Sequence, residues 1–471
     1  MRRSGRSPAA ALRAAALALL LPAAPAAAQG ELARSLDAES GIELAVEVQD
    51  LDGRVVFSHR GGEPMVLASN TKLLTTAAAL DRLGADSRWR TELVADGAAL
   101  WVRGDGDPSL RATPGEDHAE AFLDAAASAL REAGLRAFGE LVLDDRAFDR
   151  ERVHPLWPVD QLSYDYSAPV SALSVGGNVL ELRIGRDQRL RLDPQPGDAV
   201  RLDRRPRSGQ VFSAFWTDDL ALRVQGDLAR PATGRLALRA PVAFFGAWLR
   251  AGLEARGVRV ERVRLAEEAE AFPAAEPVLA WDSAWTVGEA VMLANKESDN
   301  FVSEVLLRTL GARAEGEGSA AAGARAVAAA LADLGVDTSG LNQADGSGYA
   351  RGGEPPANAA PPRLLCELLR AMAHHPAREL YFDSLVVGGE EGRLRSLFDE
   401  PPFAPRAVRA KTGWITGASS LSGYLLGGED VLVFSIVVNY VKDNTPRTNG
   451  KRFRAVQEEL LREVLQSWTD S

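Results

Sequence analysis

The sequence predicts an α/β protein whose main sheet is assembled from both ends of the chain, with a large β-rich insertion between them. Alternating apolar and polar residues mark two strands near the N-terminus. Three strand-like runs lie near the C-terminus, and helical patterns lie beside both groups. The middle of the chain instead carries short alternating runs separated by Gly, Pro and Asp. We therefore expect a five-stranded antiparallel sheet in residues 29–88 and 270–471, with a β-rich insertion in residues 89–269.

The first 28 residues have the pattern of a secretory signal peptide. An arginine-rich start precedes a short apolar run at residues 14–21, and Ala26-Ala27-Ala28 stands before Gln29 as a cleavage site. A retained anchor is the alternative, which the short run and its flanking prolines disfavour. We expect a secreted protein of the periplasm or the outer cell surface.

Charge and cysteine content exclude several classes of function. The formal net charge is −11, and removing a leader with four arginines and no acids makes it −15. This acidity disfavours nucleic acid as a partner. The single cysteine, Cys366, excludes an intrachain disulfide and lies in an amphipathic helical pattern typical of core packing. His374-His375 resembles a helix end rather than a metal site, so we expect no metal or cofactor. The sequence carries no signature of oligomeric state.

The N-terminal elements follow in order. Residues 30–40 form a short helical pattern, and residues 42–59 alternate around Asp52-Gly53 as a β-hairpin. Helix formers then run from Leu73 to Leu83, and Gly84 ends them.

The middle region predicts several strands, one helix at residues 116–133 and a solvated linker at 265–278. The strand-like runs cover residues 99–104, 139–145, 179–185, 188–194 and 220–226. Turn chemistry accounts for the Gly-Asp-Gly-Asp-Pro stretch as well as a cation loop would.

Helical patterns return at Thr286, which forms a capping box with Glu289. Further helices are predicted at 317–334, around Cys366 and at 452–468. Three strands lie between the last two of these helices, at residues 406–413, 420–427 and 431–441.

Three short motifs carry the chemistry. Ser69 and Lys72 stand three apart at the start of a helix, so they share a face, and a neutral lysine there can deprotonate the serine. Alone, this pair is more typical of an N-cap serine and a solvated lysine, because S-x-x-K is frequent by chance. Ser298 and Asn300 form an S-x-N element, and a K-T-G element begins at Lys411. The ordered triple is typical of penicillin-recognising serine acyl transferases.

Each residue type has a reason to be there. Ser69 attacks a peptide carbonyl, and Lys72, made less basic by burial and neighbouring cations, accepts its proton. Ser298 can relay that proton to the leaving amine. Asn300 can hold Lys72 and the substrate amide, and Lys411 helps to keep Lys72 neutral and attracts a substrate carboxylate.

The K-T-G strand supplies the remaining contacts. Thr412 can donate a hydrogen bond to the substrate carboxylate, and Gly413 lets the substrate backbone approach the strand edge. The backbone N–H groups of Ser69 and Trp414 would form the oxyanion hole.

The chain resembles the class C low-molecular-mass penicillin-binding proteins, the D-alanyl-D-alanine carboxypeptidase/endopeptidases of peptidase family S13, over nearly its whole mature length. The long gap of 229 residues between Ser69 and Ser298 is this family's mark. Further matching stretches cover residues 104–110, 166–174, 345–351, 382–394 and 419–425.

The resemblance implies a transpeptidase-like, β-lactamase-like α/β/α domain with two inserted domains. It also implies hydrolysis of the D-Ala–D-Ala bond of peptidoglycan stem peptides and, in some members, of D-Ala–diaminopimelate cross-links. No metal is needed, and β-lactams inhibit by acylation.

One departure and one subsite follow from the same resemblance. The family usually has Thr or Ser where Trp414 stands, so a hydroxyl near the substrate carboxylate is lost. Arg351 and Thr416 match family positions that bind diaminopimelate, and Asp160 and Tyr166 are candidates for the acid and the aromatic of that subsite. Arg351 and Asp160 are equally consistent with ordinary surface charges.

Two rival functions remain on the same fold. A serine β-lactamase needs an E-x-x-L-N element for fast deacylation, but Leu341-Asn342 follows Thr338 where glutamate would stand. A non-catalytic wall-binding protein would not need the intact serines and lysines. A labelled penicillin distinguishes the three functions. A peptidase forms a stable adduct, a β-lactamase forms a transient one, and a non-catalytic wall-binding protein forms none.

Overall fold

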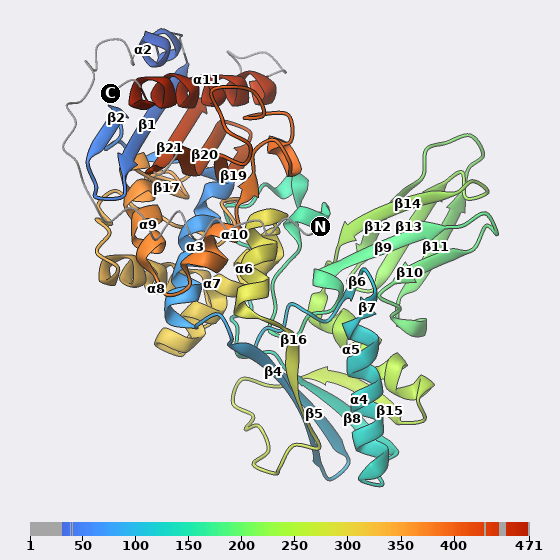
Figure 1. The fold of residues 1–471 in the computed structure, drawn as a ribbon. Helices are drawn as coiled ribbons and strands as arrows, with labels where there is room; N and C mark the ends of the chain where they lie inside the picture. Colours follow the sequence, from blue (N-terminus) through green and yellow to red (C-terminus); the bar gives the residue numbers. More distant parts are fainter. Residues whose placement is uncertain (1–30, 38, 40, 428–429, 442–448, 470–471) are drawn as a thin grey trace, which may run out of the picture. The chain divides into compact units, whose positions relative to one another are not determined.

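The computed structural model describes residues 31–37, 39, 41–427, 430–441 and 449–469, which fold into two compact units (Figure 1). Unit 1 holds the described residues up to Ala85, with 291–299 and those from 324 onward. Unit 2 holds residues 86–290 and 300–323. The predicted boundary at residue 270 differs from this division, because a strand at Leu279–Thr286 pairs inside unit 2. The division of the insertion into two small domains stays a prediction.

The main sheet of unit 1 is antiparallel throughout and joins both ends of the chain, as predicted. Its strand order is β18-β19-β20-β21-β1-β2. The strands are β18 (Val386–Val387), β19 (Val408–Ile415), β20 (Ala418–Gly427), β21 (Asp430–Tyr440), β1 (Ile42–Asp50) and β2 (Val55–His59). The five predicted strands are all present, and the count of five is wrong by one short edge strand. The sequence gives no sign of β18 because two residues are too few for an alternating pattern.

Pairing within this sheet confirms the predicted hairpins. In the N-terminal hairpin, Val48 pairs with Phe57 across the turn at Asp52-Gly53. Gly427 pairs with Asp430 in the second hairpin, and the predicted turn residues 428 and 429 lie outside the described residues. Two further short strands, β3 (Met65–Val66) and β17 (Ala359–Ala360), form a separate pair in unit 1.

Helices cover both faces of the main sheet, giving the three layers of an α/β/α domain (Figure 1). On one face, α2 (Glu31–Asp37) and α11 (Asn449–Thr469) add Leu36, Phe453 and Leu461 to a core with the strands. On the other face, α9 (Pro362–His374) packs on β1 and β21, with α3 (Thr71–Arg82) against it. Further elements of this unit are η2 (Ala68–Asn70), α10 (Arg378–Asp383) and η7 (Gly392–Leu394). Cys366 is fully buried in α9, as its helical pattern predicts.

Unit 2 is built on a mixed five-stranded sheet of order β15-β8-β5-β4-β16. Its strands are β15 (Arg259–Leu265), β8 (Ala137–Asp144), β5 (Ala99–Gly104), β4 (Arg88–Asp96) and β16 (Leu279–Thr286). Two three-stranded sheets follow, from β9 (Val179–Ile184), β10 (Leu190–Asp193) and β14 (Ala232–Ala237), and from β11 (Arg201–Pro206), β12 (Ser213–Asp218) and β13 (Ala221–Gly226). A pair formed by β6 (Ala112–Thr113) and β7 (Glu116–Asp117) completes the strands described here. Every run that predicted a strand in this region forms one.

The helices of unit 2 include one that the sequence analysis missed. The predicted helix is α4 (His118–Glu132), and α5 (Pro241–Ala255) is the missed one. Residues of α5 are apolar on most sides, so the run lacks the one-sided pattern of a surface helix. Short 3₁₀ turns, with α7 (Asn300–Glu315), complete the unit; the turns are η3 (Val159–Gln161), η4 (Asp165–Ser167), η5 (Gly176–Asn178) and η6 (Gly197–Ala199).

The predicted capping box is present. The Thr286 N–H donates to the Glu289 carboxylate (2.8 Å), and the Glu289 N–H donates to the Thr286 hydroxyl (3.2 Å). These bonds begin α6 (Val287–Lys296), and α8 (Ala320–Asp333) matches the helix predicted at 317–334.

No helix among the described residues is long and apolar enough to cross a membrane. The predicted signal peptide, residues 1–28, lies outside the described residues.

Candidate active site

The candidate nucleophile lies at a strained point of the chain in unit 1. Ser69 occupies η2, two residues before the start of α3, and it is partly exposed. The preceding residue, Ala68, has φ of 48°, a left-handed conformation that costs a non-glycine residue free energy. Gly348 lies so close that a Cβ at this position would be 1.8 Å from the Ala68 carbonyl oxygen. The loop at Gly348 therefore fixes the backbone on which Ser69 stands.

Lys72 contacts Ser69, as the three-residue spacing predicts. Its Nζ donates to the Ser69 Oγ at 3.3 Å and to the Ser347 carbonyl oxygen at 2.7 Å. The lysine is fully buried in the first turn of α3. A buried amine beside a serine hydroxyl has the geometry of a general base with its nucleophile.

The loop that supplies the second contact of Lys72 is organised by a buried carboxylate, Asp345. This carboxylate accepts hydrogen bonds from the N–H groups of Ser347 (3.2 Å), Gly348 (2.7 Å) and Ala350 (2.6 Å), and from Asn358 Nδ2 (3.0 Å). The sequence analysis matched this stretch to the family but assigned no role to Asp345 or Ser347. The available signal was the Asp-Gly-Ser-Gly pattern, which favours an Asx-type turn.

Lys411 and Ser298 form a second serine–lysine pair in the same unit. The Lys411 Nζ donates to the Ser298 Oγ at 2.8 Å and to the Thr412 carbonyl oxygen at 3.2 Å. Ser298 connects α6 to α7 with φ of 59°, so the S-x-N element lies at a break between two helices. Burial, followed by the charges of Lys72 and Arg393, lowers the pKa of Lys411 well below its usual value. The charge of Lys72 is thus one reason that Lys411 is less basic than an ordinary lysine.

The K-T-G strand lies directly beside the nucleophile. A Cβ at Gly413 would be 3.0 Å from the Ser69 backbone nitrogen and 2.1 Å from the Ser420 Oγ, so only glycine fits there. In the orientation that satisfies both ends of its amide, Asn70 donates to the Lys411 carbonyl oxygen (2.9 Å) and accepts from the Ser422 hydroxyl (2.6 Å). Asn70 therefore joins the nucleophile turn to β19 and β20.

Trp414 packs against the protein rather than standing free. Its ring lies 5.8 Å from that of Tyr440, and a Cβ at Gly450 of α11 would be 3.5 Å from the indole. The side chain is 38% exposed, and Thr412 beside it is partly exposed. The position therefore offers an aromatic surface in place of a hydroxyl.

The remaining predicted residues are divided between the two units. In unit 2, Asn300 begins α7 and its Nδ2 donates to the Tyr166 carbonyl oxygen at 2.8 Å. The ring of Tyr166 stacks on that of Tyr164, and Asp160 lies exposed in η3. In unit 1, the guanidinium of Arg351 lies 5.3 Å from the ring centre of Tyr349.

Thr416, the last predicted residue, is exposed in the turn between β19 and β20 of unit 1. The described structure joins Ser69, Lys72, Ser298 and Lys411 by hydrogen bonds in two pairs, whereas the subsite of Arg351, Thr416, Asp160 and Tyr166 stays a prediction.

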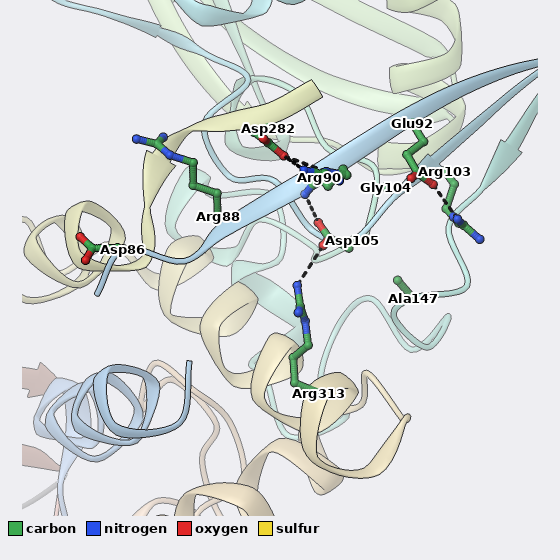
Figure 2. A pocket seen from close by; sticks show the side chains of 10 residues that line it. All are labelled: Asp86, Arg88, Arg90, Glu92, Arg103, Gly104, Asp105, Ala147, Asp282 and Arg313. Carbon is green, nitrogen blue, oxygen red and sulfur yellow. Dashed lines mark hydrogen bonds and ion pairs between the residues drawn. The ribbon is translucent and has the colours of Figure 1, made fainter. Parts of the chain in front are cut away.

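A polar pocket of about 550 Å³ in unit 2 is neutralised by its own ion pairs (Figure 2). The Asp105 carboxylate accepts from the Arg90 backbone N–H (2.7 Å) and pairs with Arg313 (3.4 Å). Arg90 in turn pairs with Asp282 at 2.8 Å. Such exposed pairs contribute little stability and leave no unbalanced charge for a ligand.

No group of three or more His, Cys, Asp or Glu side chains among the described residues could hold a metal ion. The predicted helix end at His374-His375 is confirmed, because α9 ends there and His375 Nδ1 accepts from the Ala377 N–H (3.0 Å).

Comparison with known proteins agrees with the site geometry. The model of the D-Ala-D-Ala carboxypeptidase 3 (S13) family matches residues 28–460. A D-alanyl-D-alanine carboxypeptidase of Actinomadura sp. (strain R39) is 35% identical, over 89% of this chain and 84% of that protein. The fold is similar to that of penicillin-binding protein 4 (dacB) from Haemophilus influenzae.

That crystal structure superposes with a TM-score of 0.76 at 19% identity, covering 93% of this chain and 99% of the other. The same protein complexed with a β-lactam superposes with a TM-score of 0.73 at 18% identity and the same coverage. The match to more than half of the chain and the identity to the Actinomadura enzyme together show that this chain belongs to the D-Ala-D-Ala carboxypeptidase 3 (S13) family of serine peptidases.

Proposed function

We propose that this serine D,D-peptidase hydrolyses the D-Ala–D-Ala bond of peptidoglycan stem peptides through an acyl-enzyme on Ser69. The observation that carries the proposal is the contact between Lys72 Nζ and Ser69 Oγ at 3.3 Å, in a chain of the S13 family. Peptidoglycan lies outside the cytoplasm, so the enzyme acts there. We infer that residues 1–28 direct its export to the periplasm or the outer cell surface.

Acylation begins when Lys72 takes the Ser69 proton. The Ser69 oxygen attacks the carbonyl of the penultimate D-Ala, and the C–N bond to the terminal D-Ala breaks. Ser298 carries a proton to the leaving amine, and Lys411, at 2.8 Å from Ser298, stabilises that relay. Water then hydrolyses the ester with the same groups acting in reverse.

A neutral Lys72 is essential to this scheme, and its surroundings favour the neutral form. The lysine is fully buried, and burial disfavours the charged form of an amine. The Ser347 carbonyl accepts one hydrogen of the amine at 2.7 Å, which leaves the amine oriented toward Ser69.

The oxyanion hole consists of the backbone N–H groups of Ser69 and Trp414. The close approach of Gly413 to the Ser69 nitrogen supports this assignment, because it brings the two backbone segments to one place. Two such donors typically contribute several kcal/mol to transition-state stabilisation. Asn300 is assigned to the substrate amide, and Thr412 to the terminal carboxylate.

Recognition of diaminopimelate is the finer part of the proposal. Arg351 would clasp the side-chain carboxylate, Asp160 would pair with its ammonium, and Tyr166 and Thr416 would complete the subsite. Such a subsite favours a diaminopimelate-type stem over a lysine-type stem by the roughly 1.5–3 kcal/mol of a charged hydrogen bond. It would also permit cleavage of D-Ala–diaminopimelate cross-links.

β-Lactams are proposed as covalent inhibitors that acylate Ser69. The crystal structure of penicillin-binding protein 4 from Haemophilus influenzae, which has a similar fold, contains a β-lactam. That complex supports the proposal that β-lactams bind this protein. A serine β-lactamase would release the drug rapidly, so a stable adduct distinguishes the two.

The test combines two substrates and one inhibitor. Purified enzyme is incubated with diaminopimelate-type and lysine-type muropeptides, and the products are analysed by mass spectrometry. Loss of one terminal D-Ala, faster from the diaminopimelate type, is expected. Arg351→Ala should remove the preference while a labelled penicillin still acylates the enzyme. Equal rates on both stems contradict the subsite, and no release of D-Ala from either contradicts the function.

A further inference from the structure

Ser298 lies at a point where the backbone needs support from its surroundings. It follows Lys296, the last residue of α6, by two positions and has φ of 59°. This left-handed conformation is uncommon for serine and persists where neighbouring contacts fix it. The end of α6 makes two such contacts inside unit 1, one with the helix of Lys72 and one with the strand beside that of Lys411.

Asn295 connects α6 with α3. Its side chain is fully buried, and its Nδ2 donates to the Thr76 Oγ1 (3.1 Å) and to the Ser384 Oγ (2.9 Å). The Thr76 hydroxyl in turn donates to the Lys72 carbonyl oxygen at 2.6 Å. The last turn of α6 is therefore fixed to the helix that carries the general base.

Lys296 connects α6 with the edge of the main sheet, because its Nζ forms an ion pair with the Glu391 carboxylate. That carboxylate also accepts from the Val387 N–H (3.0 Å), and the Glu391 N–H donates to the Val387 carbonyl oxygen (3.0 Å). Burial raises the pKa of Glu391, but the hydrogen bonds from Lys296 and Val387 outweigh it and hold the pKa below its usual value. Glu391 is therefore a charged group that two hydrogen bonds fix to β18.

Strand β18 lies beside the part of β19 that precedes Lys411. Val387 pairs with Arg409, two residues before the lysine, and the Lys411 Nζ donates to the Ser298 Oγ at 2.8 Å. The contacts thus form a closed path from Ser298 through Lys411, β19, β18 and the ion pair back to α6. The ion pair is the link of this path that lies nearest to Ser298 in the chain.

The exposure of the ion pair separates its effect on geometry from its effect on folding. The side chains of Lys296 and Glu391 are 21% and 40% exposed. Ion pairs with this much access to water contribute little to the stability of a fold. Loss of the pair would therefore leave unit 1 folded, while the short segment from Lys296 to Ser298 could shift relative to Lys411.

We propose that Lys296 and Glu391 are positioning residues that hold Ser298 where it passes a proton to the leaving amine. This inference rests on the proposed function, in which Ser298 is the relay, and adds what keeps the relay in place. An amine does not leave as an anion, so its nitrogen must gain a proton as the C–N bond breaks. A displacement of about 1 Å in such a path can slow the reaction by about 100-fold.

The experiment compares two substrates with the same acyl group and different leaving groups. One is a peptide that ends in D-Ala–D-Ala, and the other is the thioester in which sulfur replaces the nitrogen of the terminal residue. A thiol has a pKa of about 8.5, so it leaves as a thiolate and needs no proton.

Glu391→Ala and Lys296→Met each remove the ion pair. In both variants we expect kcat/KM to fall roughly 10- to 100-fold on the peptide and less than about threefold on the thioester. Ser298→Ala, which removes the relay itself, should show the same selectivity for the peptide with a larger loss.

Matched variants separate this role from a general loss of charge. Glu390→Ala removes the neighbouring acid, which is exposed and pairs with Arg406 at 3.4 Å, and it should keep wild-type rates on both substrates. Glu391→Gln keeps an acceptor for the Val387 N–H, and Lys296→Arg keeps the positive charge, so each should hydrolyse the peptide faster than the variant that removes the pair. The double variant should lose no more than the larger single loss, because both residues act through one contact.

The outcomes are distinct. Unchanged peptide hydrolysis in Glu391→Ala and Lys296→Met overturns the inference, as does an equal loss on peptide and thioester. An equal loss on both substrates in Ser298→Ala contradicts the relay, and the inference with it. Hydrolysis of neither substrate by the wild-type enzyme contradicts the proposed function itself.

Discussion

Lys72 Nζ lies between the Ser69 hydroxyl, at 3.3 Å, and the Ser347 carbonyl oxygen, at 2.7 Å. The second contact is the shorter one, and it comes from a loop held by the buried Asp345 carboxylate. The amine is therefore oriented by a loop 275 residues away in the chain. The reactivity of Ser69 depends on that loop as well as on η2 and α3, which carry Ser69 and Lys72.

Replacing Lys72 by arginine tests the base. Arginine stays charged at any pH that the protein tolerates, so Lys72→Arg cannot take the serine proton. We expect acylation by a labelled penicillin to slow by about 10²–10⁴-fold, the usual effect of losing an acid–base group. Lys451→Arg, on an exposed position of α11, is the matched control and should acylate normally. Near-normal acylation of Lys72→Arg would show that another group is the base.

Two glycines with the same backbone conformation test the loop that supports Ser69. Gly348 has φ of 80° and Gly352 has φ of 77°, so alanine is strained at both by about 1 kcal/mol. Only at Gly348 does the new Cβ meet backbone, 1.8 Å from the Ala68 carbonyl oxygen, whereas at Gly352 nothing lies within 4 Å. We expect Gly348→Ala to slow penicillin acylation at least tenfold and Gly352→Ala to leave it near normal. Equal rates in the two variants would contradict the supporting role of the loop.

Asp107 makes the stability of unit 2 depend on pH. Burial raises the pKa of Asp107 from 3.8 to about 6, although its Oδ1 accepts from the Ser109 N–H (2.7 Å) and hydroxyl (2.6 Å). The folded state therefore binds more protons than the unfolded state between these two values, and stability falls as the pH rises through that window. Two pKa units correspond to about 3 kcal/mol at most.

Asp107→Asn keeps an oxygen acceptor for Ser109 and cannot ionise. Urea unfolding at pH 4 and pH 7 should show that the wild-type protein loses up to about 3 kcal/mol relative to this variant as the pH rises. The nearby Asp105, whose pKa burial also raises, is present in both proteins and cancels in the comparison. The same pH dependence in both proteins would show that Asp107 is not the titrating group.

The sequence analysis succeeded where chemistry depends on local spacing. The Ser69–Lys72 contact follows from helical geometry, and the Thr286–Glu289 capping box follows from a four-residue pattern. The strands that make up most of the main sheet were accessible because each is a long strand-like run of residues. The edge strand β18 and the helix α5 were missed, since the first is too short and the second too evenly apolar to show a period.

Contacts made by the backbone could not be foreseen in the same way. A carbonyl such as that of Ser347 has no residue signature, so its bond to Lys72 depends on the fold. Trp414 packs on Tyr440 and Gly450, which belong to other segments of the chain. The sequence of each segment alone does not predict that these segments meet. For the same reason the possible partnership of Arg351 with Asp160, which lie in different units, stays a prediction.

The central claim is that Ser69 forms the acyl-enzyme, and peptide mapping of the β-lactam adduct tests it most directly. The protein is incubated with a penicillin, digested, and analysed by tandem mass spectrometry, with Ser69→Ala treated in parallel. The account predicts the mass of the intact drug on Ser69 in the wild-type protein and no adduct in the variant. An adduct on any other serine, or an undiminished adduct in Ser69→Ala, would contradict it.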